Sequence, residues 1–421
     1  MSRREFARLF AMGGSAAILS HQTLLGSKPV RMTDPITTAG KVDWKTIRSQ
    51  FLIPPELTVL NAANLCPSPA PILETVYNYT QRLDSKPVPS YRAEMIEVKE
   101  KTRQELAKYL RVSPEEILIT RNTSESNNWV SNGLDLRAGD EVVIFSDNHP
   151  SNNEAWKERG KRFGFTVNEV PPVNPHPGFD YYLETFKKAL TPRTRVLSFT
   201  HLSNTVGDLF PAKELCRMAR NRGIITLIDG AQSLGLLDVD LSDIQPDFYS
   251  GSAHKWPCGP KETGVLFVNK SIQERFWPSI YSAYKGREGL AQTHEGLGQR
   301  DTPAIHAFGQ QIKFLRKIGQ ENIEERSGNF ATEIIEELQK IKDIYIFTSD
   351  ERALRSAVVT FRPANLEPAK VVKALEEDGI VAANLGGEDW AGVRFSPHFY
   401  NSNNDVERAV GAIRRYLLKG L

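Results

Sequence analysis

The chain has few cysteines, almost no net charge and no long apolar run, and each shortage excludes a class of protein. Its three cysteines, Cys66, Cys216 and Cys258, are far apart and odd in number, so they form neither a disulfide framework nor a metal-binding pattern. The formal net charge is +2, and both signs are interspersed along the chain. We therefore expect no nucleic-acid partner, no stable membrane span and no metal site, and we expect a small-molecule ligand instead.

What the chain does have is the composition of a soluble globular protein. Its 421 residues are 25% charged and 40% hydrophobic. A chain of this length can form two domains, or one large domain with a smaller one attached to it.

The N-terminus differs from the rest of the chain. "MSRREFARLFAMGGSAAILS" places Arg3 and Arg4 before a short, weakly apolar stretch, and this arrangement resembles a twin-arginine export signal. The stretch is too short for an ordinary spanning helix. Residues 21–40 have turn formers and no periodicity, as a linker would, so the folded part is expected to start near Val42. The prediction is a periplasmic or exported protein; the alternative is a cytoplasmic protein with a basic N-terminus.

Short apolar runs alternate with helical patterns after the linker. The predicted buried strands cover residues 115–120, 140–146, 194–200, 223–229 and 263–269. Between them lie segments such as "YYLETFKKAL", whose apolar residues recur at helical spacing. Strands with few charges, separated by helices, favour a mostly parallel sheet covered on both faces. Ligands of such sheets bind at the carboxyl ends of the strands.

Polar residues stand at several of these strand ends. Thr123 and Ser124 precede a predicted helix, where hydroxyls and free N–H groups can bind an anion, although both residues are also ordinary helix caps. His149 follows the second strand, and a lone histidine is more often structural. Asp229 ends an apolar run, where a carboxylate is costly without a partner.

A lysine in an unusual loop completes this set. In "YSGSAHKWPCGP" (249–260), Lys255 stands among small residues typical of turns and close backbone packing. A phosphate cradle, an aromatic ring, a buried carboxylate and a lysine within one α/β sheet are what pyridoxal phosphate (PLP) requires.

Six segments make the pattern specific: TSESNN, HPSN, HLSNTVG, DGAQSLG, SGSAHKWPCGPKETG and GVRFSPHFYN. In this order they resemble the motifs of the class V, fold-type I PLP-dependent aminotransferase family, over most of the chain after about residue 55. The resemblance implies an α/β fold with a large, mostly parallel seven-stranded sheet domain and a smaller α/β C-terminal domain. It predicts a signal and linker at 1–40, a segment packed on the small domain at 41–60, the PLP domain at 61–300 and the small domain at 301–421.

The resemblance also implies residue roles. Lys255 would form the Schiff base with the cofactor, Asp229 would pair with its pyridine nitrogen, and His149 would stack on its ring. The other predicted cofactor contacts are Gln232 and Asn204 at the phenolic oxygen, and Thr123, Ser124, Ser252 and His254 at the phosphate.

Further roles concern the substrate and a second subunit. Arg394 would bind the substrate α-carboxylate, a task suited to a planar, two-pronged donor. Asn64 would lie beside the substrate. Thr302, in "GQRDT" (298–302), would contact the phosphate of the neighbouring subunit, so the resemblance implies a homodimer with active sites at its interface.

The branch of the family is read from the C-terminal motif. Cysteine desulfurases need a nucleophilic cysteine shortly before the C-terminal arginine, and residues 378–395 contain none. "RFSPHFYN" resembles isopenicillin N epimerase-like proteins and related carbon–sulfur lyases instead. The expected activity is chemistry at the α-carbon of an amino acid or peptide-like substrate, bound as an external aldimine. Epimerisation, transamination and carbon–sulfur lysis remain open, as does tailoring of a secondary metabolite by an exported enzyme. A non-catalytic PLP-binding protein is the alternative of another class.

Overall fold

The computed structural model describes residues 32–37, 40–281, 288–386 and 390–421. Arg3 and Arg4 lie outside the described residues, so the export signal stays a prediction from the sequence. Within the described ranges, no helix is both long and apolar enough to cross a membrane.

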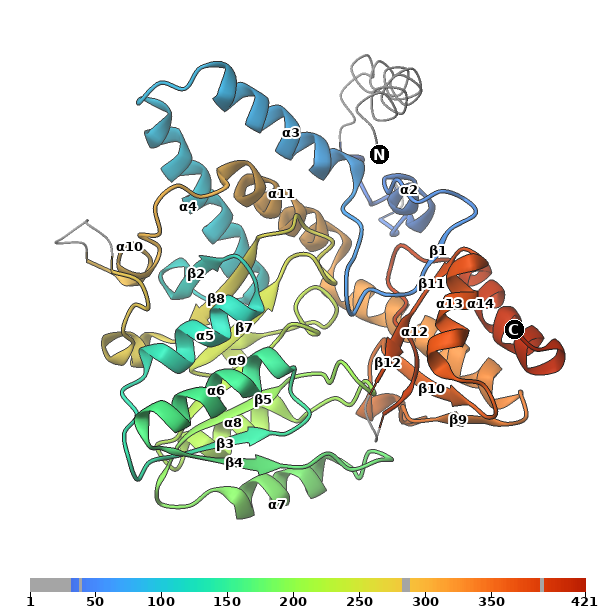
Figure 1. Ribbon diagram of the computed structural model, residues 1–421. Helices are drawn as coiled ribbons and strands as arrows, with labels where there is room; N and C mark the ends of the chain where they lie inside the picture. The colour runs from blue at the N-terminus through green and yellow to red at the C-terminus, as the bar shows by residue number, and fades with distance from the viewer. Residues whose placement is uncertain (1–31, 38–39, 282–287, 387–389) are drawn as a thin grey trace, which may run out of the picture.

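The centre of the molecule is a seven-stranded sheet with the order β2-β8-β7-β6-β5-β3-β4 (Figure 1). In chain order its strands are β2 (Ile117–Thr120), β3 (Glu141–Phe145), β4 (Thr166–Val170), β5 (Thr194–Thr200), β6 (Ile225–Asp229), β7 (Phe248–Ser252) and β8 (Gly264–Val268). Only β8 runs against its neighbours, β2 and β7. The predicted mostly parallel sheet is confirmed, and each predicted strand is present with ends shifted by at most two residues.

Helices cover both faces of this sheet. The long ones are α3 (Ala70–Ser85), α4 (Tyr91–Leu110), α5 (Thr123–Gly133), α6 (Pro150–Phe163), α7 (Phe179–Ala189), α8 (Ala212–Arg220) and α11 (Thr302–Ile318). Short helices are α2 (Trp44–Ser49), α9 (Leu241–Ile244) and α10 (Leu290–His294), with 3-10 turns η1 (Pro114–Glu116), η2 (Lys270–Arg275) and η3 (Arg352–Leu354).

Alternate strand residues face opposite sides of the sheet, as the two-residue period of a strand requires. In β3, Val143 and Phe145 join the core under α4, α7, α8 and α11. Val142 and Ile144 join the core under α5 and α6. This double burial explains why the strands are continuous apolar runs in the sequence.

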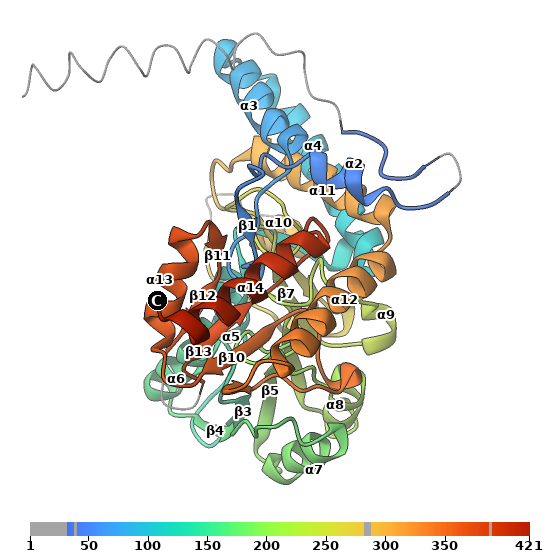
Figure 2. The same ribbon diagram turned by 90° about the vertical axis from the view of Figure 1, so that its right-hand side faces the viewer.

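A second, smaller sheet lies beside the main one, and Figure 2 brings it to the front. Its order is β12-β13-β10-β9, all antiparallel. The strands are β9 (Ile344–Ile346), β10 (Val359–Pro363), β12 (Ala383–Leu385) and β13 (Gly392–Phe395), and the helices are α12 (Gln320–Gln339), α13 (Pro368–Glu377) and α14 (Asn403–Lys419). These elements share a separate apolar core.

The N-terminal segment reaches this smaller part. β1 (Thr58–Val59) pairs in parallel with β11 (Ile380–Val381), and Leu60 belongs to the smaller core. Helix α11 packs against α3 and α4 of the large part. Apart from Leu60, the residues of the smaller core all belong to α12 or to later segments of the chain. The domain limits drawn from the sequence stay predictions.

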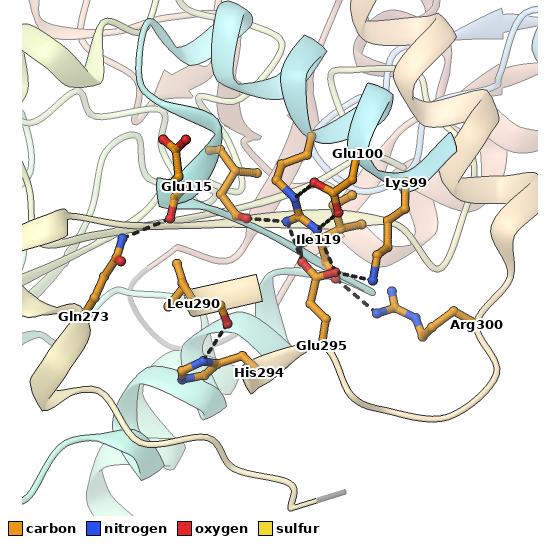
Figure 3. Close-up of polar contacts among 11 residues, drawn as sticks. Lys99, Glu100, Glu115, Ile119, Gln273, Leu290, His294, Glu295 and Arg300 are labelled. Carbon is orange, nitrogen blue, oxygen red and sulfur yellow. Dashed lines mark hydrogen bonds and ion pairs between the residues drawn. The ribbon is translucent and has the colours of Figure 1, made fainter. Parts of the chain in front are cut away.

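The outer edge of β2 is covered by charged side chains (Figure 3). Ile117 O accepts from Arg103, the Ile119 N–H donates to Glu295 Oε1 (2.7 Å), and Ile119 O accepts from Arg300 Nη1 (3.1 Å). An edge strand otherwise offers unpaired backbone groups to other chains. These three side chains therefore satisfy the free edge and tie residues 295–300 to β2.

Glu295 is the centre of this cluster. Its carboxylate accepts hydrogen bonds from two guanidinium nitrogens of Arg103, at 2.7 and 3.0 Å. It also forms an ion pair with Lys99 Nζ at 3.0 Å. Burial raises the pKa of Glu295, but Arg103, Lys99 and the Ile119 amide outweigh burial and hold the pKa below its usual range.

We expect Glu295→Ala to lower the free energy of unfolding by about 3 kcal/mol, because it leaves the buried Arg103 without its main counter-charge. Urea unfolding measures the change. Glu97→Ala is the control: it breaks an exposed pair with Lys101 (2.6 Å) and should cost less than about 1 kcal/mol. Equal stability of the two variants would contradict a structural role for the cluster.

Candidate functional site

A cavity of about 290 Å³ opens at the carboxyl ends of the parallel strands. It is lined by Ala63, Asn64, Asn122, Thr123, Ser124, His149, Ser151, Asn204, Asp229, Ala231, Gln232, Ser252, His254, Lys255 and Arg394. Every site residue predicted from the sequence except Thr302 is in this set. The lining comes from turns after β2, β3 and β5, from the ends of β6 and β7, and from β13 of the smaller sheet. The cavity therefore lies between the two sheets.

Thr302 is the exception. It is the first residue of α11, is 4% exposed and does not line the cavity of its own chain. Its contact with the phosphate of a neighbouring subunit stays a prediction.

Lys255 lies at the cavity wall, half-buried, three residues after β7 ends. Its carbonyl oxygen accepts from the Cys258 N–H (2.9 Å), but its side-chain amine forms no hydrogen bond or ion pair with any residue that the structure describes. Burial lowers the pKa of Lys255 to about 8, although Asp229 favours its charged form. A lysine amine with a lowered pKa is more often in the neutral, nucleophilic state.

Asp229 is the last residue of β6 and is 3% exposed. Its Oδ1 accepts from the Ala231 N–H (3.1 Å). Its Oδ2 accepts from Asn127 Nδ2 (2.8 Å) and Asn152 Nδ2 (3.5 Å). Within the described chain no cation forms an ion pair with this carboxylate, so neutral donors satisfy it.

An anion-binding arrangement lies at the start of α5. The Asn122 side chain caps this helix by accepting from the Glu125 N–H (2.9 Å). Ser252 Oγ lies 2.8 Å from the Thr123 nitrogen and 2.7 Å from its hydroxyl. Hydroxyl groups beside a helix N-terminus can bind a phosphate through direct hydrogen bonds and through the helix dipole.

Two histidines border this region as neutral rings. Burial, and then the charge of Lys255, lower the pKa of His254 to about 4 and also lower the pKa of His149. His149 caps α6, and its Nδ1 accepts from the Ser151 N–H (3.2 Å). Both histidines are therefore uncharged at neutral pH.

Gln232 is fixed by the protein at both ends of its amide. Nε2 donates to Ala63 O (3.1 Å), and Oε1 accepts from the indole of Trp256 (2.7 Å). Trp256 follows Lys255 directly, so this bond also ties the lysine loop to the turn after β6.

Arg394 enters the cavity from β13. Its guanidinium donates to Asn204 O (2.6 Å) and to Asn61 Oδ1 (3.3 Å), whereas Nε is buried without a partner among the described residues. The side chain is 5% exposed overall, and burial lowers its pKa to about 10. A buried guanidinium with a free donor at a cavity wall is suited to bind a carboxylate.

Sequence reasoning missed several contributors. Asn122 and Ser151 line the cavity, and both stand directly beside predicted residues in "RNTS" and "HPSN". Asn61, Asn127 and Asn152 do not line the cavity but contact residues that do. Asn61 accepts from Arg394, and Asn127 and Asn152 donate to Asp229. Asn127 and Asn152 stand in the motifs TSESNN and HPSN, but their contacts join separate elements, which the motifs do not reveal.

The family model for class V aminotransferases matches residues 59–409. The chain belongs to this family. Isopenicillin N epimerase from Amycolatopsis lactamdurans is 28% identical over 390 residues, which cover 88% of this chain and 98% of the relative. A probable cysteine desulfurase from Methanothermobacter thermautotrophicus is 27% identical over 378 residues, covering 83% and 92%.

Solved structures agree on the fold. A C-DES mutant with glycine covalently linked to its PLP cofactor has a TM-score of 0.80 at 21% identity, over 87% of this chain and 98% of that one. The apo structure of cysteine desulfurase from Thermococcus onnurineus NA1 also reaches 0.80, at 23% identity, over 93% and 100%. The predicted fold-type I architecture is confirmed, and PLP is the cofactor of this class V enzyme.

The residues of the cavity fit PLP. The start of α5 offers hydroxyls and N–H groups to a phosphate, Asp229 offers an acceptor without a competing cation, and Lys255 offers an unpaired amine. These are the anion site, the carboxylate and the amine that the cofactor's phosphate, ring nitrogen and aldehyde require.

We expect Lys255→Ala to remove the visible absorbance band of PLP bound through an imine, because that bond needs a lysine amine. The fold should persist, as far-UV circular dichroism would show, because the Lys255 amine has no partner among the described residues and the substitution keeps the backbone bond from Cys258. Lys261→Ala, an exposed lysine in the same loop, should keep the band. A full band in the Lys255→Ala variant would contradict the assignment.

Proposed function

We propose that this class V enzyme acts at the α-carbon of an amino acid, or an amino-acid-derived, peptide-like substrate, that carries a free α-carboxylate. The observation that carries the proposal is that Arg394, with its unpartnered Nε, lines the same cavity as Lys255. A carboxylate bound to Arg394 would place the neighbouring amino group within the cavity that holds the lysine.

The cofactor contacts of this proposal follow the lining of the cavity. When bound, PLP supplies a ring that draws electrons from the substrate α-carbon. Lys255 would hold the aldehyde, Asp229 the ring nitrogen and His149 the ring face, with Gln232 and Asn204 near the phenolic oxygen. Thr123, Ser124, Ser252 and His254 would hold the phosphate.

Lys255 is also our candidate for proton transfer at the α-carbon. Its pKa of about 8 lies close to neutral pH, where a group can both accept and release a proton efficiently. His149 has a lowered pKa and is neutral, so it is suited to a packing role above the ring.

We further propose that the enzyme does not form a persulfide as a cysteine desulfurase would. Cys66, Cys216 and Cys258 are all buried, and none lines the cavity. Burial also raises the pKa of the thiols of Cys258 and Cys216, which makes them poor nucleophiles. No cysteine lies in residues 378–395.

Among reactions at the α-carbon, we favour an isopenicillin N epimerase-like activity. The similarity to isopenicillin N epimerase spans 98% of that relative. Transamination and carbon–sulfur lysis share the same first proton transfer, so they are the other outcomes of the test. A PLP-binding protein without catalysis would bind ligands without turnover.

One experiment separates these outcomes. The holoenzyme is incubated in heavy water with L-amino acids, thioether amino acids and short peptides, and products are followed by NMR. Deuterium at the α-carbon supports the proposal; the D-isomer, a keto acid, or pyruvate with sulfide then identifies the reaction. Alanine and a protein-bound persulfide formed from L-cysteine would contradict it, and so would spectral changes without any exchange across the panel.

We also propose a homodimer. Large apolar side chains are exposed on α3 and α4 and after η2, namely Tyr77, Ile96, Trp277, Ile280 and Tyr281. A contiguous exposed apolar patch is typical of an interaction surface, and we propose that these side chains form one. Light scattering should give the mass of two chains for the holoprotein, and a single-chain mass at micromolar concentration would contradict the dimer.

We expect Arg394→Ala to lower kcat/KM tenfold to a hundredfold for a substrate with an α-carboxylate. A charge-assisted hydrogen bond is worth about 1.5–3 kcal/mol, which corresponds to this range. The matching amine without the carboxylate should react equally with both enzymes. Arg362→Ala, on the neighbouring strand β10 and outside the cavity, is the control. An unchanged kcat/KM would refute carboxylate binding by Arg394.

A further inference from the structure

Two asparagines from neighbouring helices converge on Asp229. Asn127 lies in α5 and Asn152 in α6, and both side chains are fully buried. Their Nδ2 atoms lie 2.8 Å and 3.5 Å from the same carboxylate oxygen, Oδ2. Neither asparagine lines the cavity, so both act on the cofactor site through Asp229.

The orientation of both amides is set by their other partners. Asn152 Oδ1 accepts from Trp156 Nε1 and from Ser198 Oγ, each at 3.1 Å. An indole N–H can only donate, so the oxygen of Asn152 must face Trp156 and its NH₂ group must face Asp229. Asn127 Oδ1 accepts from Ser250 Oγ (2.7 Å), an arrangement in which its NH₂ group faces Asp229.

These donors determine the hydrogen-bonding role of Asp229. An amide NH₂ group only donates, so Oδ2 must accept, and Oδ1 accepts from the Ala231 N–H. A neutral carboxylic acid would have to present its proton elsewhere and would bind these donors more weakly. The network therefore gives both carboxylate oxygens donors at a buried place, where no water supplies them.

The choice of neutral donors has a chemical consequence. Lys255, His149 and Tyr249 are the titratable groups that interact with Asp229, and none of them makes an ion pair with it. Amide donors bind the carboxylate without neutralising its charge. A carboxylate that keeps its charge is the partner that a protonated pyridine nitrogen requires.

We propose that Asn127 and Asn152 are positioning residues that hold Asp229 in place as a hydrogen-bond acceptor, so that it pairs with the ring nitrogen of PLP and that nitrogen stays protonated. The inference rests on the proposed pairing of Asp229 with that nitrogen. It adds that the protonation of the cofactor is set by two residues that do not touch it.

The test uses holoenzyme reconstituted with PLP labelled with ¹⁵N in the ring, and the readout is the ¹⁵N resonance together with the PLP dissociation constant. The wild type should show a protonated nitrogen. Asn127→Leu should move the resonance toward the unprotonated position and weaken PLP binding at least tenfold. Asn152→Leu, which removes a longer bond, should act in the same direction and serves if Asn127→Leu does not fold.

Asn153→Leu is the matched control. Asn153 is a buried asparagine that lies in α6 next to Asn152, but it donates to Phe145 O (3.1 Å) and Ser146 O (2.9 Å) instead of Asp229. This variant should lose stability while the resonance stays at the protonated position. A purely structural role for Asn127 would give the same result as this control and would overturn the inference.

Asp229→Ala separates the inference from the proposed function on which it rests. If this variant loses the nitrogen proton but the Asn127 and Asn152 variants keep it, the pairing stands and the inference is wrong. If Asp229→Ala keeps the nitrogen protonated, the pairing itself fails, and the inference fails with it.

Discussion

A buried carboxylate that forms no ion pair with any described residue is the constraint around which this site is built. Asp229 ends a central strand at 3% exposure, so the protein itself must supply the hydrogen bonds that water would give. The donors come from the turn after β6 and from α5 and α6, which pack on one face of the sheet. At the cavity, α5 begins with Thr123, and His149 caps the start of α6. The burial of one charge thus links the sheet, the helices that cover it and the lining of the cavity.

Much of this arrangement was predictable from the sequence. Strands such as β5 and β6 are buried on both faces, so they stand out as apolar runs, and the residues after them must meet at one edge. The strand β4 was missed because it lies at the sheet edge, where Thr166 and Glu169 are exposed and no apolar run forms. The strands β9 and β12 of the smaller sheet were missed because they are three residues long and only partly buried, so no apolar run forms.

The support behind the site could not be predicted in the same way. Asn127 and Asn152 stand in the motifs TSESNN and HPSN, but a motif does not show which distant side chain its asparagine contacts. Their function depends on α5 and α6 meeting β6 in space. The same holds for Glu295, whose partners Arg103 and Ile119 are more than 170 positions away in the chain. Predictions from motifs locate the groups that contact a ligand, whereas the groups that orient them depend on tertiary contacts.

The central claim is that Lys255 holds PLP in this cavity, and borohydride reduction tests it most directly. Reduction converts the imine between PLP and a lysine into a stable amine, which peptide mapping by mass spectrometry can locate. The account predicts one pyridoxyl group per chain, on the peptide that contains Lys255. A pyridoxyl group on another lysine, or no labelled peptide from a PLP-saturated protein, would contradict it.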